Sequence, residues 1–471
     1  MSAPHAEFAT ETARRREHRG WCWYDWANSV FPTSITTVFL SLYLTTVATR
    51  AAESDVARNG MAACPGGDAL QRCDIAVLGW SFPAGSLWGY LLSAAAVIQV
   101  LVLPIAGAIA DRTRDKRRML GTFAFGGAGT TTLLAFVDGR NWLLGAVLFL
   151  LANLCFGAAV VVYYSLLPEI AGPDERDALS TRGWAFGYLG GGAALALHLV
   201  IYVGHGALGI DQGTAVRLVF VSCGVWWAAF TVLPLRTLRG HGSAPDFASG
   251  ATSKETILGT GFRQLATTLR QARRLPLTLA FLGAYMVFTD GISTVFKVSA
   301  QYGDLELGLD RQVLITTILI VQFIAFLGGM LHGWVARGLG AKRTIMLSLL
   351  VWIVVLVGAF FIRQGQPLQF YGVAAGIGLV LGGTNALSRS LFSQMIPAGS
   401  EAEYFSLYQI GERSTSWLGP LLFAVVGQTT GSFRLAILSL LGFFVLGLLL
   451  VALVPVRRAI REAGNSVPEA L

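Results

Sequence analysis

The chain has 471 residues, of which 54% are hydrophobic and only 13% are charged, about half the charged share that is usual in soluble domains. Its mean hydropathy of +0.60 excludes a disordered chain and a water-soluble globule, because a soluble fold of this length could not bury so much apolar surface even as three domains. The formal net charge is +8, but Lys and Arg collect in the cytoplasmic loops of membrane proteins. We therefore predict a multi-pass membrane protein with lipid around its apolar exterior and no nucleic-acid partner.

Twelve apolar runs are long enough to cross the hydrocarbon core, which takes about 20 residues in a helix. Backbone polar groups in lipid must bond to one another, so these runs are predicted to be helices rather than strands of an open sheet. The expected spans are 26–49, 84–110, 119–137, 142–167, 181–203, 215–235, 276–300, 312–336, 343–362, 367–392, 404–428 and 433–454. The fold class is therefore an all-α membrane protein with twelve transmembrane helices.

A polar stretch at 236–275 divides these spans into two sets of six. The predicted organisation is an N-terminal cytoplasmic segment (1–25), a six-helix bundle (26–235), a cytoplasmic linker (236–275), a second six-helix bundle (276–455) and a cytoplasmic tail (456–471). The two halves also echo each other. The basic run that follows Gly107-Ala-Ile-Ala-Asp111 has a counterpart after Gly333-Trp-Val-Ala-Arg337, and two Ala-Gly pairs recur at nearly the same offset. Repeated six-helix halves are the arrangement of one large transporter class.

The positive charges predict the orientation. If the N-terminus is cytoplasmic, most of the 35 Lys and Arg residues fall in cytoplasmic segments. Both termini are therefore expected in the cytoplasm, in a protein of the cell's plasma membrane. The outer loop 50–83 contains Cys64 and Cys73, which could pair if that side is oxidising. The other three cysteines are expected to be small apolar fillers, and no His/Cys cluster has metal-ligand spacing, so we predict neither a metal nor a cofactor.

Three parts of the sequence resemble a known family. Gly107-Ala-Ile-Ala-Asp-Arg-Thr-Arg-Asp-Lys-Arg-Arg118 resembles the loop motif between helices two and three of the major facilitator superfamily, although Arg114 stands where the motif has its second glycine. Trp23–Ser29, and Ala386–Phe405 followed by Ser416–Phe423, are similar to the branch related to the autophagy-linked vacuolar amino-acid effluxers and their bacterial relatives. This resemblance implies two pseudo-symmetric six-helix bundles, transport by alternating access and amino acids as candidate solutes.

Glu412 and Arg413 are the clearest ionisable residues within a predicted span. Such a group costs at least about 2.5 kcal/mol at the bilayer centre, so it needs a structural or functional reason. We predict that Glu412 titrates a proton and that Arg413 holds a solute carboxylate. The alternative is a structural ion pair with polar groups on neighbouring helices.

Asp290 and Lys297 lie seven residues apart on one helix face. Asp290 is predicted to face a cavity, and Lys297 either does the same or reaches the outer interface.

Asp25 and Asn28 share one face of the first span, one turn before Pro32. Asp25 is either a cap at the start of that helix or a cytoplasmic gate or coupling residue. The neighbouring Trp21, Trp23 and Trp26 are most simply an interfacial aromatic belt.

Further polar residues within the spans could line a cavity or bond helices together, at about 0.6 kcal/mol for each hydrogen bond. These residues are Asn153, Tyr188, Gln322, Thr384, Asn385 and Arg389. Arg389 lies near the cytoplasmic end of its span and could instead reach the interface.

Asp111, Arg112 and Glu169 are predicted to form a cytoplasmic latch. Their charges would hold the two bundles together in the outward-facing state and separate when the inner side opens. The cations from Arg114 to Arg118 are expected to be ordinary charges that set the topology.

The sequence thus predicts a secondary active or facilitative transporter of a small polar solute, with amino acids as the candidate class, driven either by a proton gradient or by the solute's own gradient. Its partners would be the solute, the lipid bilayer and protons, and a monomer is expected. A sensor or receptor, or a carrier of sugars or lipids, is the alternative. The spans hold no constellation typical of an enzyme, and no Gly-Lys-Ser/Thr phosphate loop occurs, so we predict no enzymatic activity.

Overall fold

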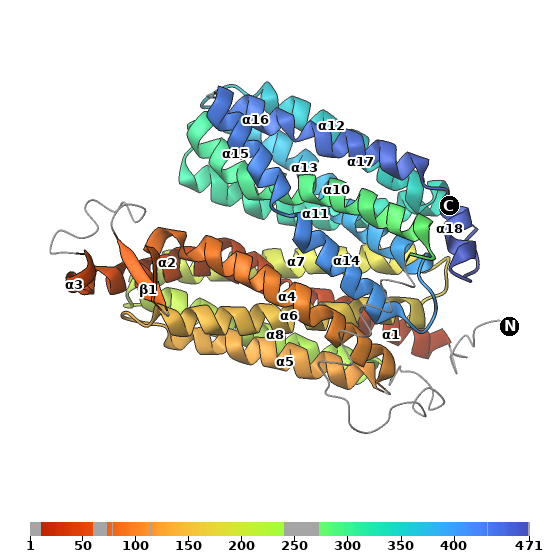
Figure 1. The fold of residues 1–471 in the computed structure, drawn as a ribbon, viewed down its shortest axis with the longest axis horizontal. Helices are drawn as coiled ribbons and strands as arrows, with labels where there is room; N and C mark the ends of the chain where they lie inside the picture. Colours follow the sequence, from red (N-terminus) through yellow and green to blue (C-terminus); the bar gives the residue numbers. More distant parts are fainter. Residues whose placement is uncertain are drawn as a thin grey trace.

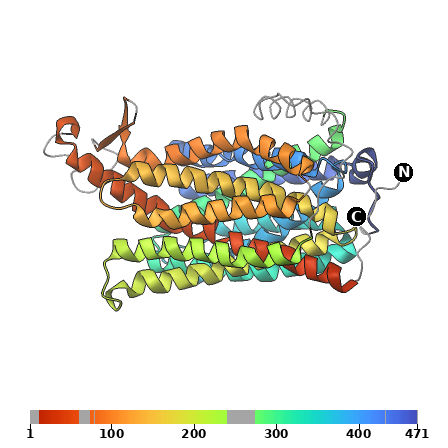
Figure 2. The same ribbon diagram turned by 90° about the horizontal axis from the view of Figure 1, so that it is seen from below.

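The predicted spans are helices in the computed structural model, which describes residues 11–59, 73–77, 79–113, 115–239, 273–430 and 432–469. Figure 1 shows them as two bundles side by side, one from each half of the chain, and Figure 2 shows the same arrangement after a quarter turn. The start of α1 and the final helix α18 lie at the same end of the molecule, which we call the termini end. The chain thus has the fold expected for twelve transmembrane helices in two bundles.

The first bundle contains the helices α1 (Glu11–Asn28), η1 (Phe31–Phe39), α2 (Leu40–Ser54), α4 (Leu87–Arg112), α5 (Lys116–Leu133), α6 (Trp142–Ile170), α7 (Arg176–Val203) and α8 (Gln212–Thr237). The second contains α10 (Pro276–Gln301), α11 (Arg311–Leu339), α12 (Ala341–Phe360), α13 (Pro367–Gln394), α14 (Glu401–Thr415), α15 (Leu418–Thr430), α16 (Phe433–Ser439) and α17 (Leu441–Leu453), followed by α18 (Val456–Glu462).

Three predicted spans are interrupted within their length, and the last of them, 433–454, is α16 followed by α17 with a break at Leu440. The first begins at Glu11, well before the predicted residue 26, and its middle part η1 is a π-helix that starts beside Pro32. Proline lacks an N–H donor, which favours a local change in the hydrogen-bond pattern. The predicted span 404–428 is α14 followed by α15, with a break at Ser416 and Trp417. Eleven helical segments of the described chain are therefore long and apolar enough to cross a membrane, and the pair of α14 and α15 accounts for the twelfth predicted span.

A small folded cap lies at the end opposite the termini. It contains α3 (Val56–Asn59) and an antiparallel hairpin of β1 (Asp74–Val77) and β2 (Trp80–Pro83). The Asn59 side chain donates to the carbonyl oxygens of Ala52 and Asp74 and so ties this hairpin to α2. Cys73 is disulfide-bonded, whereas Cys64 lies outside the described residues. Cys22, Cys155 and Cys223 are free thiols.

The two bundles meet along two seams, where α7 packs on α11 and α13 and where α4 packs on α14. Glycine allows the close approach in the second seam. A Cβ atom at Gly107 would lie 2.6 Å from the backbone carbonyl oxygen of Ala402, and backbone cannot move aside as a flexible side chain can. Small residues at such contacts let two helices come close together.

Candidate functional site

A central cavity of about 310 Å³ lies between the two bundles. Its walls come from α1, η1, α6 and α7 on one side and from α10, α11, α13 and α14 on the other. Its polar lining is Asp25, Asn28, Ser29, Thr33, Thr37, Ser293, Gln322, Asn385, Gln409, Glu412 and Arg413, and its aromatic lining is Phe156, Tyr164, Trp184, Tyr188 and Phe296. A polar space enclosed by both halves is the arrangement that alternating access requires.

A second cavity of about 550 Å³ continues from the first, away from the termini end. Thr37, Phe296, Ile318 and Arg413 line both cavities, so the two spaces are adjacent. The outer one is bounded by residues near the start of α4 and α13, such as Trp88 and Phe370. The chain is therefore hollow from its middle toward the end that carries the hairpin, while the bundles are in contact at the termini end.

Glu412 and Arg413, both on α14, face the central cavity. Glu412 Oε2 accepts from the Tyr285 hydroxyl at 3.3 Å and from Gln409 Nε2 at 3.4 Å. Arg413 Nη2 donates to Gln409 Oε1 at 3.4 Å, while its Nε has no hydrogen-bond partner. Within the described part of the chain, neither residue has an ion-pair partner, so the structural ion pair that we considered as the alternative is not formed there.

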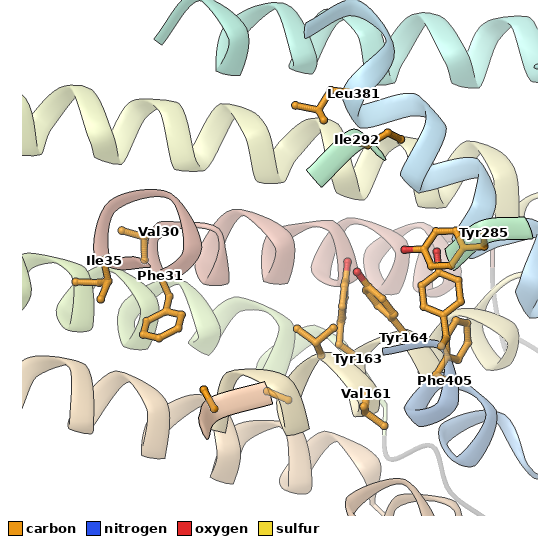
Figure 3. Close-up of a cluster of buried hydrophobic side chains, with 14 of the residues drawn as sticks. Val30, Phe31, Ile35, Val161, Tyr163, Tyr164, Tyr285, Ile292, Leu381 and Phe405 are labelled. Carbon is orange, nitrogen blue, oxygen red and sulfur yellow. The ribbon is translucent and has the colours of Figure 1, made fainter. Parts of the chain in front are cut away.

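Asp25 lies inside a helix and does not cap one. Because α1 begins at Glu11, the interpretation of Asp25 as a helix-start cap is wrong. Its carboxylate faces the central cavity and keeps 13% of its side chain exposed. The Tyr163 hydroxyl donates to Asp25 Oδ2 at 2.8 Å. Figure 3 shows Tyr163 and Tyr164 together on α6. Asn28 also lines this cavity.

Arg389 does not reach an interface. It is fully buried, and it is not among the lining residues of either cavity. Its Nε and Nη2 donate to Oγ and the carbonyl oxygen of Ser180, both at 2.9 Å, and its Nη1 lies 3.5 Å from Asp25 Oδ2. Its guanidinium carbon is 4.7 Å from the ring centroids of both Trp21 and Tyr164. Arg389 therefore connects α13 of the second bundle to α1, α6 and α7 of the first.

Trp21 corrects the prediction of an aromatic belt. Its side chain is fully buried, stacks on Tyr163 with ring centroids 4.4 Å apart, and donates from Nε1 to the Tyr163 carbonyl oxygen at 3.1 Å. Trp23 and Trp26 also pack on aromatic rings within the protein, including Phe230. The prediction assumed that the first helix starts after these tryptophans. Because the helix already begins at Glu11, Trp21 lies within the bundle and not at its surface.

Further hydrogen bonds join α7 to α13 around Arg389. Ser180 Oγ donates to the Ala386 carbonyl oxygen at 2.6 Å, and Ser390 Oγ donates to Asp177 Oδ1 at 2.6 Å. Arg176 Nη1 donates to the Ser393 carbonyl oxygen at 2.9 Å. We call this set of contacts, together with Arg389, the α7–α13 seam. Sequence reasoning missed it, because small hydroxyl residues in a helix give no signal of what they contact across a bundle.

Asp111 lies at the second seam. Its two carboxylate oxygens accept from the backbone N–H groups of Ala402 and Glu403, each at 2.9 Å, in the first turn of α14. This is the favourable position for an anion at a helix N-terminus. Lys116 Nζ bonds to Asp111 Oδ1 at 3.2 Å and also to Glu169.

Lys116 was expected to be a simple topology charge, and that expectation is wrong because it is 1% exposed and lies between two carboxylates. Arg112 is the exposed last residue of α4.

The comparison with protein families decides the family. Residues 13–464 match the family described as "Vacuole effluxer Atg22 like". The chain belongs to this family. It is 26% identical over 442 residues to the uncharacterised MFS-type transporter YxiO of Bacillus subtilis, covering 93% of this chain and 95% of that protein. It is also 26% identical over 549 residues to autophagy-related protein 22-1 of Penicillium rubens, covering 96% and 92%.

Solved structures with the same fold are transporters of the major facilitator superfamily. FucP in its outward conformation superimposes with a TM-score of 0.64 at 11% identity, covering 93% of this chain and 99% of FucP. The proton:xylose symporter XylE gives a TM-score of 0.65 at 13% identity, covering 94% and 95%. This Atg22-like chain is thus a multi-pass membrane protein with the fold of an MFS-type transporter.

Two predicted cavity residues of this Atg22-like chain lie elsewhere. Asp290 is 1% exposed, is not among the lining residues of either cavity, and accepts from the Gly419 backbone N–H at 2.9 Å. It therefore satisfies a free donor at the start of α15, beside the break in the span. Thr384 is fully buried, and its hydroxyl donates to the Val380 carbonyl oxygen of its own helix.

The remaining candidates line the two cavities. Asn385, Tyr188 and Gln322 lie in the central cavity, while Asn153 and Lys297 lie in the outer one. Asn385 Oδ1 accepts from the Thr289 hydroxyl at 3.2 Å.

Proposed function

We propose that this chain carries a small zwitterionic solute, of the amino-acid class, across the plasma membrane by alternating access. The observation that carries the proposal is the presence of Glu412 and Arg413 in the central cavity with no ion-pair partner in the described part of the chain. Two opposite charges left unpaired in a low-dielectric space are costly, and a ligand that supplies both complementary charges removes that cost.

The size of the cavity supports a small solute. Its volume of about 310 Å³ lies at the lower end of the roughly 300–1,000 Å³ typical of small-molecule sites. Apolar residues such as Val160, Ile292 and Leu381 share the lining with the charged ones. An amino acid with an apolar side chain would therefore match the cavity both in charge and in surface.

Each end of the solute has a suitable partner. The planar guanidinium of Arg413 suits a carboxylate, since it donates several hydrogen bonds in a fixed geometry. The solute's ammonium group would bind a carboxylate, for which Glu412 and Asp25 are available. Asn28, Gln322 and Asn385 add amide groups that orient the solute.

Proton coupling and orientation complete the proposal. Glu412 is the proposed proton site, because its hydrogen-bond partners Tyr285 and Gln409 are neutral groups. In this proposal both termini lie in the cytoplasm, which the positive charge at the termini end supports. The hollow then opens to the outside, and the two seams close the cytoplasmic side.

Thermal unfolding of the purified protein with amino acids, sugars, nucleosides and dipeptides tests the solute class, since a specific ligand raises apparent stability by mass action. We expect apolar L-amino acids to raise the unfolding temperature and to exchange across the membrane of reconstituted vesicles. Arg217→Gln serves as a control variant that should respond to the same compounds, because Arg217 pairs with Asp138 away from both cavities. Stabilisation by sugars alone, or by none of these compounds, would contradict the proposal.

A further inference from the structure

Arg389 belongs to one bundle and makes its contacts in the other. It is part of α13, yet its hydrogen bonds go to Ser180 on α7 and its charge partner is Asp25 on α1. The rings around the guanidinium also come from the first bundle: Trp21, Tyr163, Tyr164 and Trp184. Opening the termini end must withdraw this cation from its binding site, because the two bundles separate there.

Asp25 takes part in two environments at once. On one side its Oδ2 atom receives the Tyr163 hydroxyl at 2.8 Å and faces Arg389 Nη1 at 3.5 Å. On the other side the residue lines the central cavity. No hydrogen bond in the described part of the chain engages Asp25 Oδ1. The same carboxylate is therefore within reach of a solute in the cavity and of the arginine that joins the bundles.

The contact between Asp25 and Arg389 is a loose one. Arg389 Nη1 is buried and has no hydrogen-bond partner of good geometry, although it lies within ion-pair distance of Asp25. A buried cation depends strongly on its counter-charge, since burial without compensation is expensive. A second cation that binds the same carboxylate would therefore weaken the hold on Arg389.

We propose that Asp25 is the coupling residue between the solute cavity and the α7–α13 seam: the ammonium group of a bound solute competes with Arg389 for this carboxylate and so releases the seam. This inference rests on the proposed zwitterionic solute. The seam bonds below Arg389, such as Ser390 to Asp177 and Arg176 to Ser393, join the same two helix segments and would open with it. Solutes without a cationic group would bind at Arg413 but leave the seam closed.

Spin labels at the termini end measure the opening directly. Arg118 at the start of α5 and Arg343 at the start of α12 are both exposed and belong to different bundles. A variant with Arg118→Cys and Arg343→Cys, and with the free thiols Cys22, Cys155 and Cys223 replaced by Ala, gives one distance by pulsed electron paramagnetic resonance. This parent protein is compared with the same protein that also carries Asp25→Asn.

Without any solute, Asp25→Asn should increase the population with a long distance, because Asn keeps the shape but removes the charge that holds Arg389. Arg389→Gln should do the same, and the double variant should add little to either single change. The control Asp138→Asn removes a carboxylate at the opposite end and should leave the distances unchanged. A distance distribution unaltered by Asp25→Asn would show that Asp25 does not hold the α7–α13 seam closed, whatever the solute is.

L-leucine and N-acetyl-L-leucine test the competition, because only the first has an ammonium group. Leucine should increase the long-distance population in the parent, and N-acetyl-leucine should not, although both raise the unfolding temperature. Equal opening by the two compounds, or an equal further response to leucine in Asp25→Asn, would overturn the competition. If neither compound raises the unfolding temperature, the proposed solute class fails, and the solute-free comparison alone decides the role of Asp25.

Discussion

Asp111 Oδ1 accepts a hydrogen bond from the backbone N–H of Ala402 at 2.9 Å, so that the last turn of α4 in one bundle caps the first turn of α14 in the other. The contact joins a full charge to the positive end of a helix, an interaction that stabilises by up to about 2 kcal/mol when partly buried. Because the two helices belong to different bundles, separation of the bundles at the termini end would break it. The contact therefore favours the state in which the hollow faces away from the termini.

Asp111→Asn should shift the protein toward opening at the termini end. A loss of about 1–2 kcal/mol corresponds to a change of roughly 5- to 30-fold in the ratio of closed to open states. The distance between spin labels at Arg118 and Arg343 measures this ratio. Asp115→Asn is the matched control, because Asp115 caps α5 within its own bundle, and it should leave the ratio unchanged. An equal effect of both variants would contradict a specific latch.

Lys116→Met should destabilise the protein strongly. The change leaves the carboxylates of Asp111 and Glu169 without their shared cation, and breaking a buried ion pair typically costs about 3–5 kcal/mol. The control Arg118→Met removes an exposed cation from the same helix and should change stability by no more than about 0.5 kcal/mol. Thermal unfolding in detergent compares the two, and similar unfolding temperatures would show that Lys116 is not a structural cation.

The contrast between these two cations shows where sequence reasoning stops. The spans could be predicted because lipid requires long apolar helices, and the repeat of the halves indicated two bundles. The extension of α1 to Glu11 could not, since its polar first turns lie outside any apolar run. Lys116 and Arg118 look alike in the sequence, and only the packing of α4, α5 and α6 decides which one is buried.

For the same reason, the sequence predicted only some of the residues that line the cavity. Glu412 and Asp290 are both carboxylates within a span, yet one faces the cavity and the other caps α15. The rotation of each helix about its axis separates them, and that rotation depends on contacts far apart in the sequence. The surroundings of Arg389 were harder still to predict from the sequence, because they are built from α1, α6 and α7 of the opposite bundle.

Gly107→Ala should disfavour the closed termini end. The new Cβ atom would lie 2.6 Å from the Ala402 carbonyl oxygen, so α4 and α14 must separate to accommodate it. The control Gly129→Ala lies on α5, where a Cβ atom would meet nothing within 4 Å, and it should slightly stabilise the helix. Spin-label distances and unfolding temperatures together separate opening from general destabilisation. No change in the distance would show that the contact between α4 and α14 can adapt around a methyl group.

Arg413→Gln should weaken binding of a zwitterion more than binding of the same compound without its carboxylate. A hydrogen bond to a charged group contributes about 1.5–3 kcal/mol, so the affinity for L-leucine should fall roughly 10- to 150-fold, whereas the affinity for L-leucinamide should change little. Competition binding on the purified protein gives both values, and Arg217→Gln is the control. Equal losses for the two compounds would count against a carboxylate site at Arg413.

Glu412→Gln should remove the pH dependence of uptake while leaving the protein folded. Glutamine keeps the shape of the side chain and can still bond with Tyr285 and Gln409, but it cannot take up a proton. Uptake into reconstituted vesicles over a range of external pH measures the effect. Glu306→Gln is the matched control, because Glu306 pairs with Arg434 outside both cavities. A pH profile that survives in Glu412→Gln and disappears in Glu306→Gln would move the proton site to Glu306, and a profile that survives in both would exclude both carboxylates from coupling.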